Sequence, residues 1–240
     1  MALPKIKHPT YSITIPSTKQ QVNIRPFTVQ EEKLLLMARQ SEDQDDVVKS
    51  IKQIITNCVI EKIDVDKLST FDIEYIFIKL RAKSVGELVD LEYQVPDSET
   101  NEVIKFKLNL DEIEVKFNPD HKNKFIIMND VGVVMRYPTL NEIRAIESGN
   151  GSEQSVLNIL IKCVESIFDQ DSVYDDFTEE EVVEFINNLP LDAMQNMRTF
   201  FETMPTVEHT SKVKNKAGQE IEVTLRGLNS FFTWWPVIAI

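Results

Sequence analysis

The sequence predicts an α+β fold that is internally duplicated, with each repeat built from a β-hairpin, two to four helices and a closing β-hairpin. Two observations predict this fold. The segments IRPFTVQE at residues 24–31 and MRYPTLNE at residues 135–142 carry Arg, Thr and Glu at one constant offset. The order of alternating and helical hydrophobic patterns after each segment is also the same. We therefore predict a first repeat at 1–117, a second at 118–226 with an acidic helical insertion, and an apolar, aromatic tail at 227–240.

Each repeat is predicted to open with a pair of strands. Apolar and polar residues alternate in four short runs, as strands with one buried face require: residues 11–15 and 21–25, then 125–128 and 133–136. The second pair is joined by Asn-Asp-Val-Gly at residues 129–132, and Asn, Asp and Gly tolerate the positive φ that tight turns need.

A helix is predicted after each strand pair. Thr28 with Glu31, and Thr139 with Glu142, have the spacing of a capping box, in which the hydroxyl and the carboxylate satisfy free backbone N–H groups. We expect the first helix to end in the acidic loop at residues 41–46. The second should end at Gly149-Asn150-Gly151.

The next helix of each repeat is predicted to be strongly amphipathic. Its buried face comprises Val47, Ile51, Ile54, Ile55 and Cys58 in the first repeat, and Val156, Leu160, Cys163, Val164 and Ile167 in the second. The two cysteines therefore occupy equivalent positions. We expect buried, reduced thiols at both rather than reactive groups.

Further helices and a closing hairpin complete each repeat. Ser69 with Asp72 and Thr178 with Glu181 again have capping-box spacing, so helices are expected at 70–83 and 179–188, and another after Pro190 with a Met-rich stripe. Alternating residues predict closing hairpins that pair 88–95 with 103–110 and 207–213 with 220–226. An irregular connector lies at 118–123.

The charge of the chain makes nucleic acid and anionic membranes unfavourable partners. The formal net charge is −13, and phosphate binding depends on clustered Lys and Arg. From Cys163 to Met197 there is no Lys or Arg, but ten acidic residues. This stretch is typical of a solvated surface, with a patch that steers a basic protein partner as the alternative. No segment has the ~20 apolar residues of a membrane-spanning helix.

The sequence shows no constellation that predicts catalysis. Neither a GxxxxGK[ST] loop nor a GxGxxG after a strand occurs. His8, His121 and His209 are far apart, no CxxC or HExxH is present, and the acidic residues lack calcium-loop spacing. We therefore expect no catalytic, cofactor-binding or metal-binding residues, and a protein that is not an enzyme.

The tail is the predicted partner-binding segment. It ends the chain with almost no polar residue, and aromatic anchors dominate binding energy at protein interfaces. The predicted contact residues are Phe231, Phe232, Trp234, Trp235 and Ile238. Packing of this tail against the core of its own chain is the alternative.

Three segments resemble the T4-like bacteriophage baseplate proteins, a family whose members belong to the central hub of the tail baseplate. They are IRPFTVQEEKLLLMA at 24–38, LSTFDIEYIFIKLRAKSVGELVDLEY at 68–93 and IEVTLRGLNSFF at 221–232. The resemblance implies a component of a contractile phage tail, made in the bacterial cytoplasm, with other hub and baseplate proteins as partners. It leaves two roles open: a structural component of the virion, or a transient assembly chaperone absent from the mature particle.

A duplicated chain also suggests an oligomeric state. Three copies would present six similar units, which suits the threefold and sixfold partners found in a tail. A homotrimer is therefore a further hypothesis.

Overall fold

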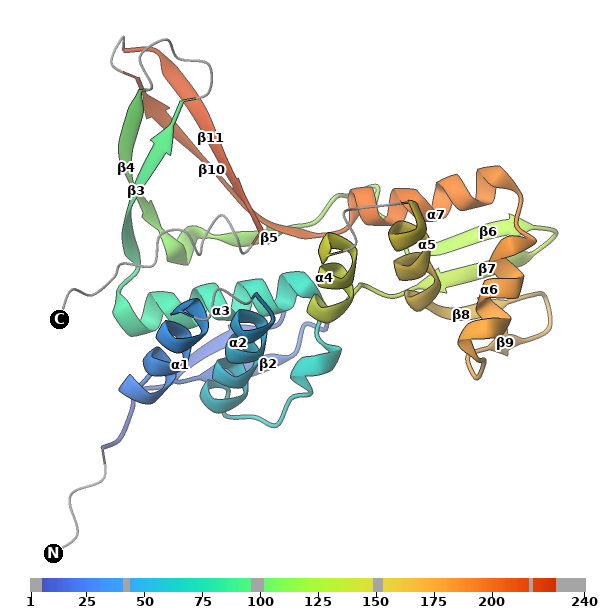
Figure 1. Ribbon diagram of the computed structural model, residues 1–240, viewed down its shortest axis with the longest axis horizontal. Coiled ribbons are helices and arrows are strands. Elements are labelled where there is room, and N and C mark those ends of the chain that lie inside the picture. Colours follow the sequence, from blue (N-terminus) through green and yellow to red (C-terminus); the bar gives the residue numbers. More distant parts are fainter. Residues whose placement is uncertain (1–5, 41–43, 96–101, 149–152, 216–217, 228–240) are drawn as a thin grey trace, which may run out of the picture. The chain divides into compact units, whose positions relative to one another are not determined.

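The computed structural model describes residues 6–40, 44–95, 102–148, 153–215 and 218–227 and has a mixed α+β fold. In these residues it contains seven α-helices and eleven strands, and the strands form small antiparallel sheets (Figure 1). The chain divides into two compact units. Unit 1 draws on residues 1–65, 71–116 and 206–240, and unit 2 on residues 66–70 and 117–205.

Unit 1 begins with a hairpin and two antiparallel helices, in the predicted order. The elements are β1 (Tyr11–Thr14), β2 (Gln21–Ile24), α1 (Val29–Gln40) and α2 (Gln44–Cys58). Helix α2 starts inside the segment predicted as an acidic loop, which corrects that expectation. Asp45 and Asp46 occupy its first turn, where carboxylates interact favourably with the N-terminal end of the helix dipole. Its buried face includes Val48 rather than Val47, together with Ile51, Ile54, Ile55 and Cys58.

Helix α3 (Thr70–Val85) is the central element of unit 1. Most of its residues are buried, so its apolar side chains surround the helix instead of forming one stripe. Two of its buried polar groups bond to segments distant in the sequence: Asp72 accepts hydrogen bonds from the backbone and hydroxyl of Ser17, and Lys79 Nζ donates to the carbonyl oxygen of Asp111 at 2.7 Å. These bonds offset the cost of burying charged groups.

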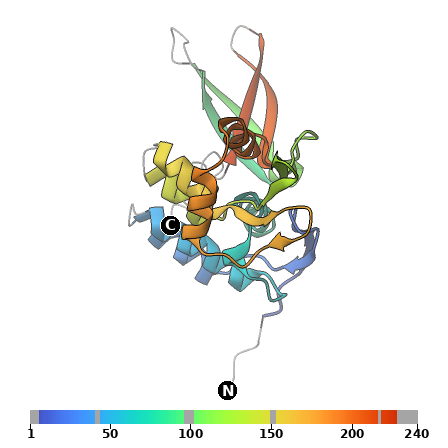
Figure 2. The same cartoon turned by 90° about the vertical axis from the view of Figure 1, so that its right-hand side faces the viewer.

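Two hairpins of unit 1 stand side by side (Figures 1 and 2). The elements are β3 (Leu88–Gln94), β4 (Val103–Asn109), the 3₁₀ helix Leu110–Glu112, β5 (Glu114–Lys116), β10 (Thr206–Lys214) and β11 (Glu220–Arg226). Both predicted closing hairpins are present, β3 with β4 and β10 with β11. Strand β10 also pairs with β5, so the β10–β11 hairpin belongs to unit 1. The compact units thus divide the chain differently from the predicted repeats, and the repeated order of elements along the chain stays a prediction.

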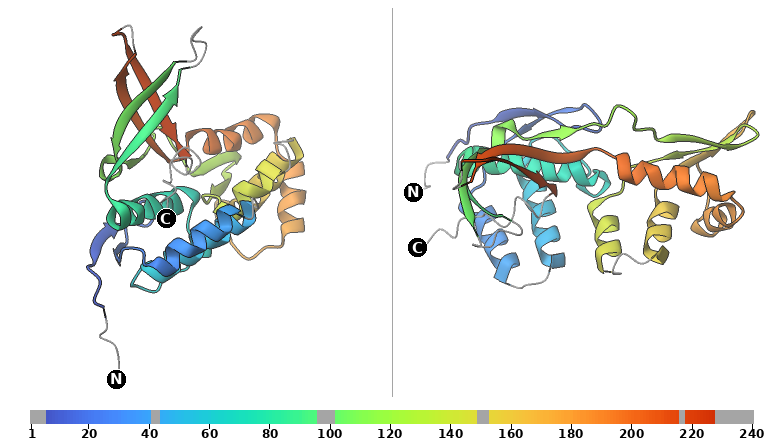
Figure 3. Two further views of the ribbon diagram at one scale, coloured as in Figure 1. Left: turned by 60° about the vertical axis from the view of Figure 1, so that its left-hand side comes forward. Right: turned by 90° about the horizontal axis from the view of Figure 1, so that it is seen from above.

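Unit 2 is a four-stranded antiparallel sheet with helices on one face. The sheet order is β6 (Lys124–Met128), β7 (Val131–Met135), β8 (Val164–Phe168) and β9 (Val173–Tyr174). The helices are α4 (Leu140–Ser148), α5 (Glu153–Lys162), α6 (Glu179–Asn187) and α7 (Leu191–Thr203). Figure 3 shows α5 and α7 on one side of β6 and β7. The predicted capping box of Thr178 and Glu181 is formed at the start of α6.

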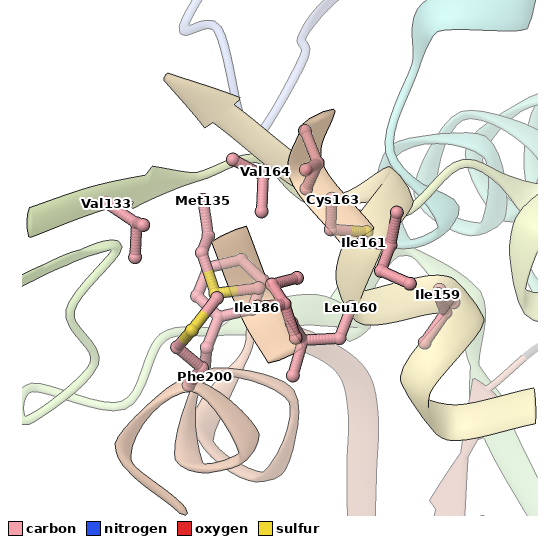
Figure 4. Close-up of a cluster of buried hydrophobic side chains, with 11 residues drawn as sticks. Val133, Met135, Ile159, Leu160, Ile161, Cys163, Val164, Ile186 and Phe200 are labelled. Carbon is pink, nitrogen blue, oxygen red and sulfur yellow. The ribbon is translucent and has the colours of Figure 1, made fainter. Parts of the chain in front are cut away.

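The core of unit 2 lies between this sheet and helices α5, α6 and α7 (Figure 4). Val133 and Met135 of β7 meet Leu160 of α5, Ile186 of α6 and Phe200 of α7. In the Met-rich stripe predicted for α7, Met197 is fully buried beside Phe200, and Met194 and Phe201 pack against the same core. The stripe is therefore core.

Two sequence expectations about unit 2 are wrong. Val164 and Ile167 lie in strand β8, not in a helix that continues from α5. Their pairing with β7 overrides a periodicity that also fits a short helix. Gly132 lies within β7 rather than in the turn, where Asn129 and Asp130 have positive φ. At Gly132 a Cβ atom would lie 2.5 Å from the carbonyl oxygen of Phe125, so glycine permits close packing there.

Candidate functional site

An ion pair and a capping threonine connect β2 to α1 in unit 1. Arg25 Nη2 lies 3.0 Å from Glu31 Oε1, and the side chain of Glu31 is only 2% exposed. The Glu31 carboxylate also accepts hydrogen bonds from the backbone N–H of Thr28 at 2.8 Å and from its hydroxyl. Arg25 donates further to the carbonyl oxygen of Pro26, and Asn57 of α2 donates to Glu31. We call this set the first Arg–Glu–Thr cluster.

Unit 2 contains the same arrangement. Arg136 Nη2 lies 2.6 Å from Glu142 Oε1, and Glu142 accepts from the backbone N–H of Thr139 at 2.8 Å and from its hydroxyl at 2.9 Å. Arg136 donates to the carbonyl oxygen of Tyr137, the counterpart of Pro26. It also donates to the carbonyl oxygen of Lys162 at the end of α5. This second Arg–Glu–Thr cluster therefore joins a strand, a helix start and the end of the next helix.

The hydrogen bonds in both clusters hold the carboxylates in the charged form. Burial by itself would raise the pKa of Glu31, but the hydrogen bonds from Arg25 and Thr28 outweigh it and lower the pKa to about 2. The pKa of Glu142 is likewise lowered, because bonds from Arg136 and Thr139 outweigh its burial. A charged carboxylate that is nearly enclosed and multiply hydrogen-bonded is a rigid structural joint, not a group poised to exchange protons.

The two cysteines lie beside these clusters. The backbone N–H of Arg25 donates to the carbonyl oxygen of Cys58, and that of Arg136 donates to the carbonyl oxygen of Cys163, both at 2.9 Å. Burial raises the pKa of each thiol to about 12. Thiolate is therefore scarce at neutral pH, and both side chains act as small buried apolar groups.

The other predicted residues are dispersed. Phe231, Phe232, Trp234, Trp235 and Ile238 lie outside the described residues. The histidines stay apart: His8 is exposed before β1, His209 lies in β10 of unit 1, and His121 packs against Tyr137 and Phe200 in unit 2.

Most acidic residues between Cys163 and Met197 are exposed, including every acid of α6. Within the part of the chain that the structure describes, no group of three or more His, Cys, Asp or Glu side chains could hold a metal ion. Among those same residues, no helix is both long and apolar enough to cross a membrane.

An apolar row on the sheet of unit 2, made of Ile126, Gly132, Phe168 and Val173, was not predicted from the sequence. Phe125 and Ile127 of β6 pack into the core, so Ile126 between them faces the opposite side. The register places Ile126 opposite Gly132, Gly132 opposite Phe168, and Phe168 opposite Val173. Positions directly opposite each other in antiparallel strands share a face. The alternation in β6 was visible in the sequence, but the two residues from β8 and β9 required the strand register.

Comparison with known protein families shows which family the chain belongs to. Residues 8–233 match the family described as T4 bacteriophage base plate protein. The chain belongs to this family. Comparison with curated proteins gave no match, and comparison with solved structures gave none either.

Membership of a baseplate family implies a location in the tail baseplate of the virion and contacts with other structural proteins of the phage. It also favours a structural role over an enzymatic one. The two Arg–Glu–Thr clusters agree with that role, because each stabilises the connection between elements and neither leaves a reactive group exposed.

Proposed function

We propose that this chain is a structural component of the central hub of a contractile phage tail baseplate and acts in baseplate assembly through protein–protein contacts. The observation that carries the proposal is the family match over residues 8–233, nearly the whole chain. The architecture supports it: small sheets and helices are joined by internally satisfied ion pairs, and both thiols are held in the unreactive form. The chain is synthesised in the host cytoplasm and incorporated from there.

The internal duplication is part of this proposal. The two Arg–Glu–Thr clusters share an Arg–Glu ion pair, bonds from a threonine to the glutamate and a bond from the Arg backbone to a Cys carbonyl. In both, the residue after the cysteine bridges to the strand before the arginine: Val59 to Ile24, and Val164 to Met135. Such matched bonds at matched positions support descent of both segments from one repeated plan.

The distribution of the chain between assembly intermediates and finished particles tests the hub role. Quantitative mass spectrometry of purified virions should find the chain in a fixed ratio to the other baseplate proteins. The alternative, a transient assembly chaperone, predicts that the chain is present in intermediates but missing from virions. A virion without the chain would overturn the structural role.

The tail residues 228–240 remain the proposed partner-binding segment, with Phe231, Phe232, Trp234, Trp235 and Ile238 as anchors. A chain that ends at Gly227 should keep its circular dichroism spectrum and unfolding midpoint but fail to enter baseplates. If the shortened chain unfolds instead, the tail is part of the core and the assignment is wrong.

A homotrimer is the proposed oligomeric state, since three duplicated chains supply six similar units. Multi-angle light scattering of the purified protein and native mass spectrometry of hub complexes measure it. A single copy per particle would exclude the trimer.

A further inference from the structure

One face of the sheet in unit 2 carries an apolar row that the helices do not cover. Helices α5, α6 and α7 contribute to the core on the other face, with Phe125 and Val133 of the sheet. The row consists of Ile126, Gly132, Phe168 and Val173, one residue from each of the four strands, and we call it the apolar row. Ile126 is 59% exposed and Val173 is 68% exposed. An exposed apolar patch with a polar rim is typical of an interaction surface.

The ring of Phe168 is held in place at the centre of the apolar row. A Cβ atom at Gly132 would overlap the ring of Phe168, so this ring lies over the glycine. Lys124 Nζ lies 4.2 Å from the centroid of the same ring, a cation–π contact that holds it from the β6 side. A ring fixed in this way loses little conformational entropy on binding, which favours its use as an anchor.

Aspartates line one end of the apolar row. Asp130 lies in the β6–β7 turn and accepts a hydrogen bond from Gln170 in the β8–β9 turn, so the two turns meet. Asp169 and Asp171 belong to the second turn, and Asp169 follows Phe168 directly. Asp130, Asp169 and Asp171 form the aspartate rim. Hydrogen bonds from Asp171, Tyr174 and Ser172 lower the pKa of Asp169, which keeps this carboxylate charged.

The apolar row and the aspartate rim together determine which side chains a docking partner must present. We propose that this face docks a segment of another phage structural protein that presents apolar side chains to Ile126, Phe168 and Val173 and Lys or Arg to the rim. This inference rests on the proposed function, because it assigns a partner surface within the baseplate. The negative rim would attract a basic partner during encounter and fix its orientation along the sheet.

Charge argues against the two other occupants. A second copy of the chain has a formal net charge of −13, so long-range repulsion between the two copies opposes their encounter. The tail at residues 228–240 contains no Lys or Arg, and thus cannot complement the aspartates. The crosslinking experiment described next would detect either a second copy or the tail at this face.

Photocrosslinking in the assembling phage identifies the occupant. The probe is p-benzoylphenylalanine placed at Val173 of the full-length chain, which replaces the phage's own copy during infection. We expect adducts with a different phage structural protein, at a segment with Lys or Arg within a few residues. The matched control places the same probe at Leu191 in α7, which is 89% exposed and belongs to the helical side of unit 2. It should give at least about tenfold less of this adduct.

Charge reversal tests the rim. Asp130→Lys together with Asp171→Lys should reduce the adduct yield at Val173 at least about tenfold, because like charges would then face each other. Glu184→Lys, an exposed acid on α6, is the matched control and should leave the yield unchanged. Circular dichroism confirms that each variant is folded.

The results of the crosslinking experiment can refute the docking face without refuting the hub role, and the reverse also holds. Whole irradiated cells and purified virions are both analysed, so an adduct is detected whether or not the chain stays in the particle. Adducts with a second copy, adducts with residues 228–240, or no adduct while the chain is present in virions would each overturn the docking face and leave the hub role intact. Absence of the chain from virions would overturn the hub role, whereas a heterologous adduct in intermediates would still support the docking face.

Discussion

Neutralising Glu31 should destabilise unit 1 by an amount that depends on pH. The substitution Glu31→Gln keeps the size of the side chain but removes the charge that pairs with Arg25 at 3.0 Å. The pKa of this carboxyl is about 2 in the folded protein, against an ordinary value of 4.5. A difference of this size corresponds to about 3 kcal/mol of stability at neutral pH.

The sign follows from the direction of the shift. Because folding lowers the pKa, the contribution is fully present above the ordinary value and is lost as pH falls toward the folded value. The pH-dependent part of the difference between wild type and Glu31→Gln should therefore decline from about 3 kcal/mol at pH 7 to about 1.5 kcal/mol near pH 3.

Urea-induced unfolding followed by circular dichroism measures the free energy of unfolding at several pH values. Hydrogen exchange of peptides from β2 and α1 assigns the change to the cluster. Glu32→Gln, the neighbouring acid in the same first turn, is the matched control and should cost less than about 1 kcal/mol. A cost below 1 kcal/mol for Glu31→Gln, or a cost equal at pH 7 and pH 3, would show that the ion pair does not stabilise the joint as described.

Three further outcomes follow from unit 2 and the thiols. Burial lowers the pKa of His121, so the unfolded state takes up a proton first, and stability should fall as pH drops below about 6.5; His121→Gln should reduce that slope in urea-unfolding curves, and the slope that stays comes from His209, whose pKa burial also lowers. Gly132→Ala should cost about 2 kcal/mol, since the new methyl group meets the ring of Phe168, and Phe168→Ala in the same chain should recover part of it; equal stability of Gly132→Ala and wild type would contradict this packing. Because burial raises the pKa of Cys58 and Cys163 to about 12, both thiols should resist Ellman's reagent until urea unfolds the chain; rapid modification of either in the native protein would refute their burial.

Local signals in the sequence predicted most elements of this fold. The capping-box spacing of Thr28 with Glu31 placed the start of α1, and alternation placed both strands of each closing hairpin within one or two residues. These signals are reliable because caps and alternation are satisfied within a few residues of the chain. The buried positions of Cys58 and Cys163 were predicted from helical periodicity, which likewise acts within a few residues of the chain.

Pairings between distant segments could not be predicted in this way. The periodicity of Val164 and Ile167 fits a helix as well as a strand, and only β7, paired alongside, decides for the strand. Strand β10 pairs with β5 although Lys116 and Glu208 are 92 residues apart. No local sequence pattern predicts that β10 pairs with a strand so distant in the chain.

By itself the sequence determined the α+β class, the β3–β4 and β10–β11 hairpins, the two Arg–Glu–Thr motifs and, through its resemblance, the baseplate family. Only the tertiary structure decided that each arginine forms an ion pair with its glutamate, that Gly132 lies under Phe168, and that four strands bring Ile126 and Val173 into one apolar row. The reason is physical: hydrophobic period and caps act over one or two turns of chain, whereas a sheet face is made by register between strands that are far apart in sequence.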